Sequence, residues 1–249
     1  MIPTEFTGRK LRRKLAADGP VETVRAAGDL LTRKRLGRPV FDPMVEHDFV
    51  RTLSRKELQR RTKTVDVPDF AAPTPFTSLV MNGVILTETG LMLTEALEII
   101  EESAAGPEHA QQAMMAMLSR ELFYGYLPLR GLLFGSWDAE SINHNPGPIA
   151  PLIPRYPDNY YHWMVETVPK IHYLRAFEAE QEPVTLLIPA EAPPFIDETL
   201  NLLGWPESRV VRANHGIYQV SELVVPSFPD RRPTDFNWLR EEILQNAPD

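Results

Sequence analysis

The chain has 249 residues, of which 43% are apolar and 24% are charged, the composition of an ordinary globular protein with a sizeable core. The absence of cysteine excludes a disulfide framework, thiolate metal sites and thiol catalysis. No apolar run approaches the roughly 20 residues that span a bilayer, and no apolar stretch follows the first lysines and arginines as in a secretory signal. We therefore expect a soluble, cytoplasmic protein.

Positive charge is concentrated near the N-terminus. Residues 1–63 contain 16 Lys or Arg and 8 Asp or Glu, a net charge of +8, whereas residues 64–249 contain 10 and 26, a net charge of −16. This pattern fits peripheral contact of residues 9–63 with an anionic membrane, and it fits equally well a solvated helical face or contact with the acidic body of the same molecule. Nucleic acid comes third, because the segment has few aromatic residues and no helix-turn-helix or zinc-finger pattern.

The N-terminal quarter of the chain is expected to form a basic helical arm. Apolar residues at loose helical spacing predict helix over residues 8–36, and Ser54 is a candidate N-cap for a second, short helix. Three prolines in Val67–Pro75 then predict an extended linker. We accordingly divide the chain into an arm, residues 1–66, and a compact domain, residues 67–249.

The first part of the compact domain is expected to contain a hairpin and a helix. Two β-rich runs within residues 83–93 flank the turn Thr87–Gly90, in which glycine supplies the positive φ of a tight turn. A Met-rich amphipathic helix is expected over residues 107–123, and its methionines are more simply core filler than a cofactor site.

From residue 147 onwards strands and helices alternate. Strands are expected at residues 148–153, 184–188, 209–211 and 223–225, and helices at residues 159–178, 195–203 and 236–245. Gly204 follows the second of these helices in the position of a C-terminal cap. This alternation predicts βαβ units, a parallel sheet covered on both faces and an α/β, Rossmann-like fold.

The densest group of reactive residue types lies just after the strand at residues 148–153, where open α/β sheets bind ligands. On a helix, Asn159, His162, Glu166 and Tyr173 form one polar stripe. A separate apolar stripe that can face the sheet consists of Met164, Val168, Ile171 and Leu174. The polar stripe is therefore expected to point toward a cleft or toward solvent.

The pair His162 and Glu166 suits acid–base chemistry, because a carboxylate one turn away fixes the imidazole tautomer and raises its basicity. An alternative is a structural histidine whose surface ion-pair partner is Glu166. A metal site made of these two residues and His172 is less favoured, because no zinc-type spacing occurs. Pro169 is expected to kink the helix. P-loop, dinucleotide-binding glycine and nucleophile-elbow motifs are absent from the sequence.

Two residues before this helix are candidate sugar contacts. Arg155 and Tyr156 can line a sugar site by hydrogen bonding and stacking, or they can simply end the strand and enter the helix. Spacing and composition do not decide between these two interpretations.

The run Asn159-Tyr-Tyr-His-Trp-Met-Val-Glu-Thr-Val-Pro-Lys-Ile-His-Tyr-Leu174 resembles the signature of family 61 glycosyltransferases. In that signature, an Asn-aromatic-aromatic-His-Trp stretch runs into a Leu/Val-Pro pair and an apolar helix. Supporting similarity extends over roughly residues 76–245. It includes Gly147–Ile153, Val184–Pro189, Leu203–Pro206, Leu223–Ser227 and Asn237–Arg240.

The resemblance implies a GT-B architecture of two Rossmann-like domains and an inverting transfer of a sugar from a nucleotide-sugar to a hydroxyl, in surface-polysaccharide or glycan assembly. It implies that His162 is the base or the group that orients the acceptor, with Glu166 in support. The acceptor, a glycan or a lipid-linked glycan, would be bound by Asn159, Tyr160, Tyr161, Trp163 and Arg155. The resemblance implies no cofactor other than the nucleotide-sugar co-substrate, and the sequence does not reveal whether a metal is used.

The chain departs from the family in its C-terminal part. Family members continue into a domain with a His-Gly-Ala segment and basic residues for the donor diphosphate, and neither is found here. We therefore expect an acceptor-side N-terminal half that is inactive or weak in isolation. Three alternatives stay open: a truncated gene product, one piece of a split enzyme whose second chain supplies the donor-binding domain, and an acceptor-binding remnant. Two rival hypotheses are a non-catalytic glycan-binding or partner subunit, and a Rossmann-like domain whose basic arm binds nucleic acid.

Overall fold

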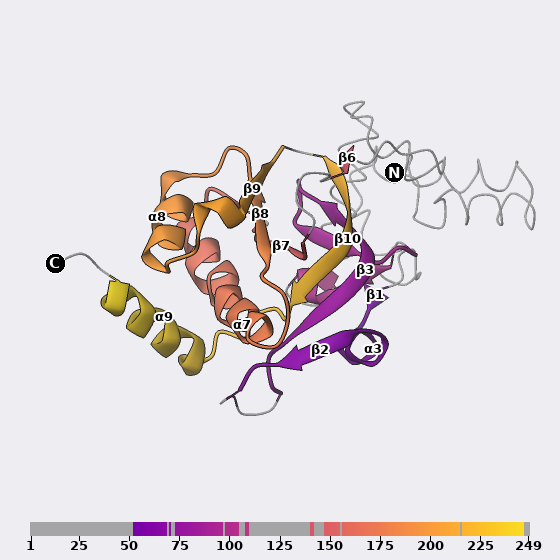
Figure 1. The fold of residues 1–249 in the computed structure, drawn as a ribbon, viewed down its shortest axis with the longest axis horizontal. Coiled ribbons are helices and arrows are strands. Elements are labelled where there is room, and N and C mark those ends of the chain that lie inside the picture. Colours follow the sequence, from indigo (N-terminus) through magenta and orange to yellow (C-terminus); the bar gives the residue numbers. More distant parts are fainter. Residues whose placement is uncertain are drawn as a thin grey trace, which may run out of the picture.

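The computed structural model describes residues 52–246, apart from residues 69, 71–72, 97, 105–107, 110–139, 142–146, 155 and 215 (Figure 1). The helix expected over residues 8–36 and nearly all of the Met-rich helix expected over residues 107–123 lie outside the described residues. The candidate sugar contact Arg155 lies outside them as well.

The described residues form a mixed α/β fold around a 10-stranded sheet. Its strands run in the order β1 (Thr52–Leu53), β5 (Ile99–Ile100), β4 (Leu91–Leu93), β3 (Phe76–Leu86), β10 (Ile217–Pro226), β7 (Ile149–Pro151), β8 (Thr185–Pro189) and β9 (Val210–Ala213). Two further strands lie off this path, β2 (Lys63–Asp66) beside β3 and β6 (Glu140–Ser141) beside β10.

The expectation of a parallel sheet is confirmed for one part and wrong for another. β7, β8 and β9 are parallel, as the alternation of strands and helices predicts. The pairs β2–β3, β3–β4 and β4–β5 are antiparallel, and the long β10 pairs with β3 antiparallel over nearly its whole length. At the edge of the sheet, β1 pairs with β5 in parallel. β10 meets β7 through a single parallel bridge between Leu223 and Ile149. The result is a mixed sheet, because the long antiparallel pair β3–β10 is joined to the parallel unit β7–β8–β9.

The boundary expected at residue 67 is corrected by the sheet. β1 pairs with β5, and β2 pairs with β3, so residues 52–66 belong to the compact body. Between them lies α3 (Arg55–Arg61), whose N-cap Ser54 accepts a hydrogen bond from the backbone N–H of Glu57, which confirms the predicted short helix. The alternating side chains of β2 form too short a run, next to a proline-rich segment, for sequence periodicity to identify a strand. The domain boundary was therefore placed after β2.

Basic residues of this segment pair with the acidic body. Arg55 binds Glu102 at 2.6 Å, and Arg61 binds Glu98 at 2.9 Å. For these two arginines the structure therefore supports the alternative of intramolecular contact. Contact of the remaining basic residues with an anionic membrane stays a prediction. The described part of the chain contains no helix that is long and apolar enough to cross a membrane.

The predicted hairpin is present and lies close to β7. Gly90, at the end of the turn between β3 and β4, has a φ of 70°. A Cβ atom at this position would lie 2.1 Å from the carbonyl oxygen of Ile153, so only glycine fits. This close approach brings the turn against the segment that follows β7.

The helices that the sequence predicts after residue 147 are present. The one expected over residues 159–178 consists of α6 (Tyr160–His162), the π-helix η3 (Trp163–Thr167) and α7 (Pro169–Glu178), and the other two are α8 (Pro194–Leu202) and α9 (Pro233–Asn246). Two short 3-10 helices, η2 (Glu101–Ser103) and η4 (Glu207–Arg209), were not predicted. Gly204 follows α8 with a φ of 66°, as expected for a C-terminal cap. Figure 1 shows α7, α8 and α9 grouped on the side of the sheet away from α3.

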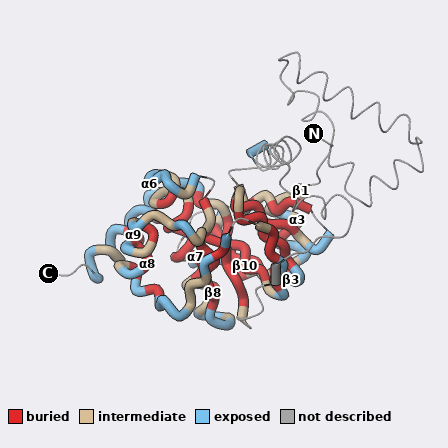
Figure 2. Tube along the Cα trace, turned by 90° about the horizontal axis from the view of Figure 1, so that it is seen from above, coloured by how far each residue is buried: buried red, intermediate tan, exposed pale blue. Residues whose placement is uncertain are grey.

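The sheet is buried on both faces, because alternate residues of its strands enter two core clusters. On β8, Leu186 and Ile188 join the cluster beneath α7, α8 and α9, whereas Leu187 joins the opposite cluster, to which α3 contributes Leu58. The tube in Figure 2 shows this buried centre beneath the partly exposed α8 and α9. On this face, α7 packs against β2, β3, β10 and α9, which fixes the place of the helical segment 160–178 on the sheet.

Candidate functional site around His162

The helical segment that carries the candidate site contains a π-helix. Asn159 begins the segment as an N-cap, since its side-chain oxygen accepts the backbone N–H of Tyr161 at 3.0 Å. The N–H of Val168 donates to the carbonyl of Trp163, five residues back, at 2.9 Å. Pro169 then occupies the first position of α7, where its missing N–H is not needed. The expected irregularity at Pro169 is therefore a π-turn just before it, a feature that is frequent at functional sites.

The π-turn changes which residues share a face. The predicted polar stripe holds for His162 and Glu166, but Tyr173 is buried in the core and does not continue it. Lys170 continues the stripe instead, and all three residues line one cavity. The predicted apolar stripe is confirmed: Val168, Ile171 and Leu174 are fully buried, and Met164 packs partly buried against the same cluster.

His162, Glu166 and Arg231 form a chain of polar contacts. Nδ1 of His162 lies 2.8 Å from Oε2 of Glu166, and the guanidinium of Arg231 lies 2.5 Å from Oε1. Burial pulls the pKa of Glu166 upward, but the hydrogen bonds of His162 and Arg231 outweigh burial and hold the pKa below its ordinary value. With Nδ1 engaged by an ionised carboxylate, Nε2 is the imidazole nitrogen that can act on another molecule.

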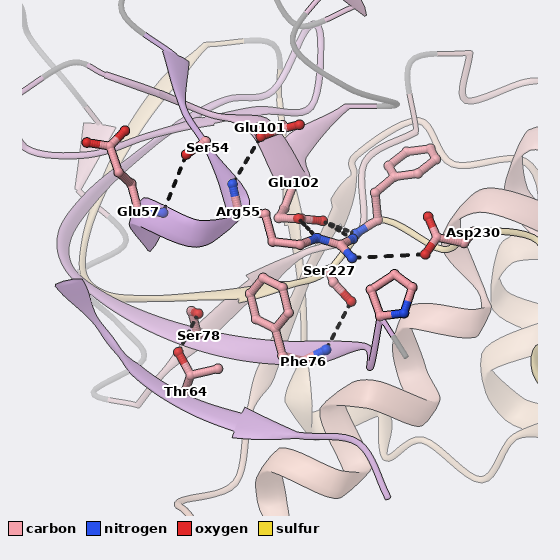
Figure 3. Close-up of polar contacts among 12 residues, drawn as sticks. Ser54, Arg55, Glu57, Thr64, Phe76, Ser78, Glu101, Glu102, Ser227 and Asp230 are labelled. Atoms are coloured by element: carbon pink, nitrogen blue, oxygen red, sulfur yellow. Dashed lines mark hydrogen bonds and ion pairs between the residues drawn. The ribbon is translucent and has the colours of Figure 1, made fainter. Parts of the chain in front are cut away.

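Arg231 lies in the segment between β10 and α9, and its backbone is strained. Its φ is 55°, a left-handed conformation that is uncommon for residues with a side chain. The same segment is held by Glu102, which accepts the backbone N–H of Phe228 at 2.5 Å and binds Arg55. Figure 3 shows Arg55 between Glu102 and Asp230, its guanidinium 4.0 Å from the latter. These contacts keep the strained segment in place beside the cavity.

Lys170 is a cation that sequence analysis did not single out. Its side chain is only 8% exposed, and its Nζ lies 5.2 Å from the centroid of the Phe228 ring. Burial lowers the pKa of Lys170 from 10.5 to about 8, and the carboxylates of Glu102 and Glu166 offset part of this effect. The spacing of four residues from Glu166 could have indicated Lys170, but a lysine on a helix is most often a solvated residue.

The cavity has a volume of about 320 Å³, at the small end of the range for ligand sites. Its walls come from α6, η3 and α7, from the segments that follow β7 and β10, and from the β3–β4 turn. The residues that matter for chemistry are Tyr156, His162, Glu166, Thr167, Lys170, Phe228 and Arg231. The cavity thus combines a histidine–carboxylate pair, two cations and aromatic rings.

Exposed tyrosines surround His162. The ring centroids of Tyr156 and His162 are 5.1 Å apart, and Tyr161 meets the same imidazole edge-to-face at 5.6 Å. Both tyrosines are about half exposed, at 50% and 52%. Tyr160 is equally exposed but packs edge-to-face on Phe195 and does not line the cavity.

The structure therefore divides the acceptor-binding residues that the resemblance implied. Tyr161 lies beside His162, Tyr160 turns to Phe195, and Asn159 caps the helix. Trp163 is a correction: it is 0% exposed within the core, where it has no surface to offer an acceptor. It packs in the core cluster with Val168, Ile171 and Leu174, a burial that the sequence signature alone does not reveal.

The metal-site alternative gains no geometric support among the described residues, which contain no group of three His, Asp or Glu side chains placed to hold a metal ion. His172 is directed elsewhere, stacked on Trp238 with ring centroids 4.7 Å apart and planes at 4°. No protein-family model matches the chain, and no curated protein or solved structure matches it significantly. The assignment of a function therefore depends on the geometry of this site and on the resemblance of residues 159–174.

Proposed function

We propose that the cavity binds a hydroxyl-bearing sugar acceptor and that His162 is the general base for an inverting transfer of a sugar from a nucleotide-sugar. The observation that carries the proposal is the 2.8 Å contact between His162 and Glu166 at the wall of a cavity flanked by exposed tyrosines. The parallel unit β7–β8–β9 with its covering helices supports the finer proposal of a Rossmann-like acceptor-side domain of a GT-B enzyme.

In the proposed reaction, Nε2 of His162 takes the proton of the acceptor hydroxyl. The hydroxyl oxygen forms a bond to the anomeric carbon while the bond from that carbon to the diphosphate oxygen breaks. The products are the lengthened glycan and a nucleoside diphosphate, and the imidazolium later releases its proton to solvent. Glu166 holds the imidazole in the required tautomer and stabilises the imidazolium that forms.

The tyrosines supply the acceptor platform. Aromatic faces offer a large apolar surface with a polar edge, which suits the alternating C–H and hydroxyl groups of a sugar ring. Tyr156 lines the cavity and contacts the imidazole, so a sugar stacked on it would bring a hydroxyl near His162. The donor nucleotide is proposed to come from a domain that faces this cavity, on this polypeptide or on a partner.

A second candidate function is glycan binding without transfer. The half-exposed tyrosines beside the cavity favour it, because they need no donor to hold a sugar. The two functions share the acceptor site and differ in whether His162 moves a proton.

The test combines acceptor binding with donor turnover. Binding of an oligosaccharide panel is followed by saturation-transfer NMR, and release of nucleoside diphosphate from a panel of nucleotide-sugars is assayed with the same acceptors. Tyr156→Ala should weaken binding about tenfold, which corresponds to about 1.4 kcal/mol. Tyr160→Ala is the matched control, since Tyr160 is similarly exposed but outside the cavity, and it should bind normally.

The role of His162 is tested by His162→Ala, which should retain the acceptor and lower diphosphate release by about 10²–10⁴-fold. Because the donor is proposed to come from a facing domain, release is assayed with that domain present, and acceptor binding without release by the wild-type protein under those conditions would assign the glycan-binding function. Equal loss of binding in the Tyr156 and Tyr160 variants, or no binding of any oligosaccharide, would contradict both functions.

A further inference from the structure

Among the described residues, the buried amine of Lys170 has no oxygen atom as a hydrogen-bond or ion-pair partner. The residue is more than nine-tenths buried and lines the cavity, and its Nζ has the ring of Phe228, which also lines the cavity, as its cation–π neighbour. Within the described ranges of the chain, no hydrogen bond or ion pair of this amine is found. Buried charges are ordinarily paired, so an unpaired buried cation facing open space indicates that its partner is a ligand.

The two nearest carboxylates are already engaged by other donors. In Glu166, one oxygen faces His162 and the other binds Arg231. In Glu102, one oxygen binds the Nε of Arg55, and the other accepts both a second nitrogen of Arg55 and a backbone N–H. These carboxylates therefore attract Lys170 through their charge, but their oxygens are directed at other partners.

Among the described residues, four ionisable side chains beside Lys170 come from different elements, and His109 also lines the cavity. Glu102 lies in η2, Glu166 in η3 and Arg231 after β10, and His162 ends α6. Each acidic group of this set is neutralised by its own arginine. The positive charge of Lys170 is consequently the one in this set that lacks a dedicated counter-ion.

We propose that Lys170 is the floor of an oxyanion subsite, so that the molecule bound beside His162 carries a carboxylate or a phosphate group. Arg231, on the rim of the cavity, adds a second positive charge to the same subsite. For the sugar part of the ligand this inference rests on the proposed function, and in those terms the acceptor is an acidic sugar or a sugar phosphate. Below pH 8 the amine carries the charge that an oxyanion needs.

The test uses four probes that separate the sugar from the anion: glucose, glucuronate, glucose 6-phosphate and inorganic phosphate. Their affinities for the full chain are measured by isothermal titration calorimetry at pH 7. We expect glucuronate or glucose 6-phosphate to bind at least tenfold more tightly than glucose. Tight binding of glucuronate alone identifies a carboxylate, and equal binding of glucose 6-phosphate and inorganic phosphate identifies a phosphate site without sugar selectivity.

Lys170→Met should abolish the preference for the acidic probe, and Lys170→Arg should retain part of it. Lys56→Met, which removes an exposed lysine of α3, is the matched control and should change nothing. Affinity for the acidic probe should also fall as the pH rises above 8, because the amine loses its proton.

An independent readout avoids substitution altogether. An amine-acylating reagent followed by peptide mass spectrometry should modify Lys170 in the free protein, and the acidic probe should protect it. Equal affinity of glucose and the acidic probes, or an unchanged preference in Lys170→Met, would overturn the subsite. If acidic probes bind through Lys170 but no sugar is transferred, the subsite stands and the proposed function fails. If neutral sugars bind tightly and their binding depends on Tyr156 alone, the proposed acceptor site stands and the oxyanion subsite fails.

Discussion

The segment of residues 160–178 carries two acid-containing clusters that differ in one respect. At its C-terminal end, Tyr173 donates to Asp235 at 2.7 Å, and the second oxygen of Asp235 accepts the backbone N–H of Arg232 at 3.3 Å. Both side chains are buried in the core. At the N-terminal end, His162 and Glu166 make an equally short contact, but they face a cavity.

The difference separates a structural cluster from a functional one. Asp235 caps the first turn of α9 while it is bound by Tyr173 of α7, so this cluster joins two helices and is closed. In the cluster around His162, Nε2 of His162 and the amine of Lys170 remain able to bind a ligand. Residue types and spacing are similar in both places, and the satisfaction of each polar atom is what distinguishes them.

The largest expected effect comes from removing the unpaired charge. At pH 7, Lys170→Met should raise the free energy of unfolding by about 3 kcal/mol, since the pKa of Lys170 falls from 10.5 to about 8 on folding. Between pH 8 and pH 10.5 the unfolded wild-type chain binds more protons than the folded one. The free energy of unfolding of the wild type should therefore rise relative to that of the variant as the pH increases over this range. Urea denaturation at pH 7 and pH 10 measures the difference. Destabilisation by Lys170→Met at both pH values would make Lys170 a structural residue.

The closed cluster should respond in the opposite direction. Tyr173→Phe removes the hydroxyl that satisfies the buried carboxylate of Asp235, and it should lower the free energy of unfolding by about 2 kcal/mol. Acceptor binding should be unaffected. Tyr160→Phe serves as the control, because Tyr160 is exposed. An unchanged urea midpoint for Tyr173→Phe would remove the distinction between the two clusters.

A smaller effect is expected for Glu166→Gln, about 1 kcal/mol of destabilisation at pH 7, because the ion pairs of Glu166 are partly solvated. The folded-state pKa of Glu166 is lowered, so its contribution is fully present above pH 4.5 and is lost as the pH falls through the folded-state value. Thermal unfolding of both proteins between pH 3 and pH 7 tests this. The exposed Glu207, changed to Gln, is the control, and a difference that grows toward low pH would contradict the expectation.

The smallest effect is expected for Trp163→Phe, below about 1 kcal/mol, because both residues are apolar and aromatic. In the described structure the buried indole N–H has no hydrogen-bond partner, so its removal leaves no acceptor unsatisfied. Acceptor affinity should also be unchanged, whereas Trp163→Ala should cost about 3–5 kcal/mol of stability. A selective loss of acceptor affinity in Trp163→Phe would restore Trp163 as a binding residue.

Much of the second half of the fold follows from sequence. The strands and helices after residue 147 have clear periodicity, and the cap residue Gly204 marks the end of α8. The pairing of β3 with β10 is different, because it joins segments more than a hundred residues apart and leaves no local signal. For this reason the mixed character of the sheet was not predicted.

Only part of the site was predicted, because local spacing indicates contacts within one helix but not contacts between distant segments. A spacing of four residues suffices to bring His162 and Glu166 together, whatever the rest of the fold does. Arg231 reaches the same carboxylate from 65 positions away, and only tertiary structure can show that. Lys170 was not singled out, because a lysine on a helix is most often a solvated residue. Trp163 was assigned to the acceptor by the resemblance, which does not show that its side chain is buried in the core.

The π-turn has a consequence for comparing this protein with others. It holds one residue more than an α-helical turn, so a protein with the same helix and no π-turn would align with this one only across a gap within Trp163–Thr167. An ungapped comparison would match His162 or Lys170 correctly, but not both. Deleting Val165 would test this register directly, because the positions after the deletion would rotate by about 100° relative to those before it. Either Lys170 and the buried residues Val168, Ile171 and Leu174 would be displaced together, or His162 would leave the cavity.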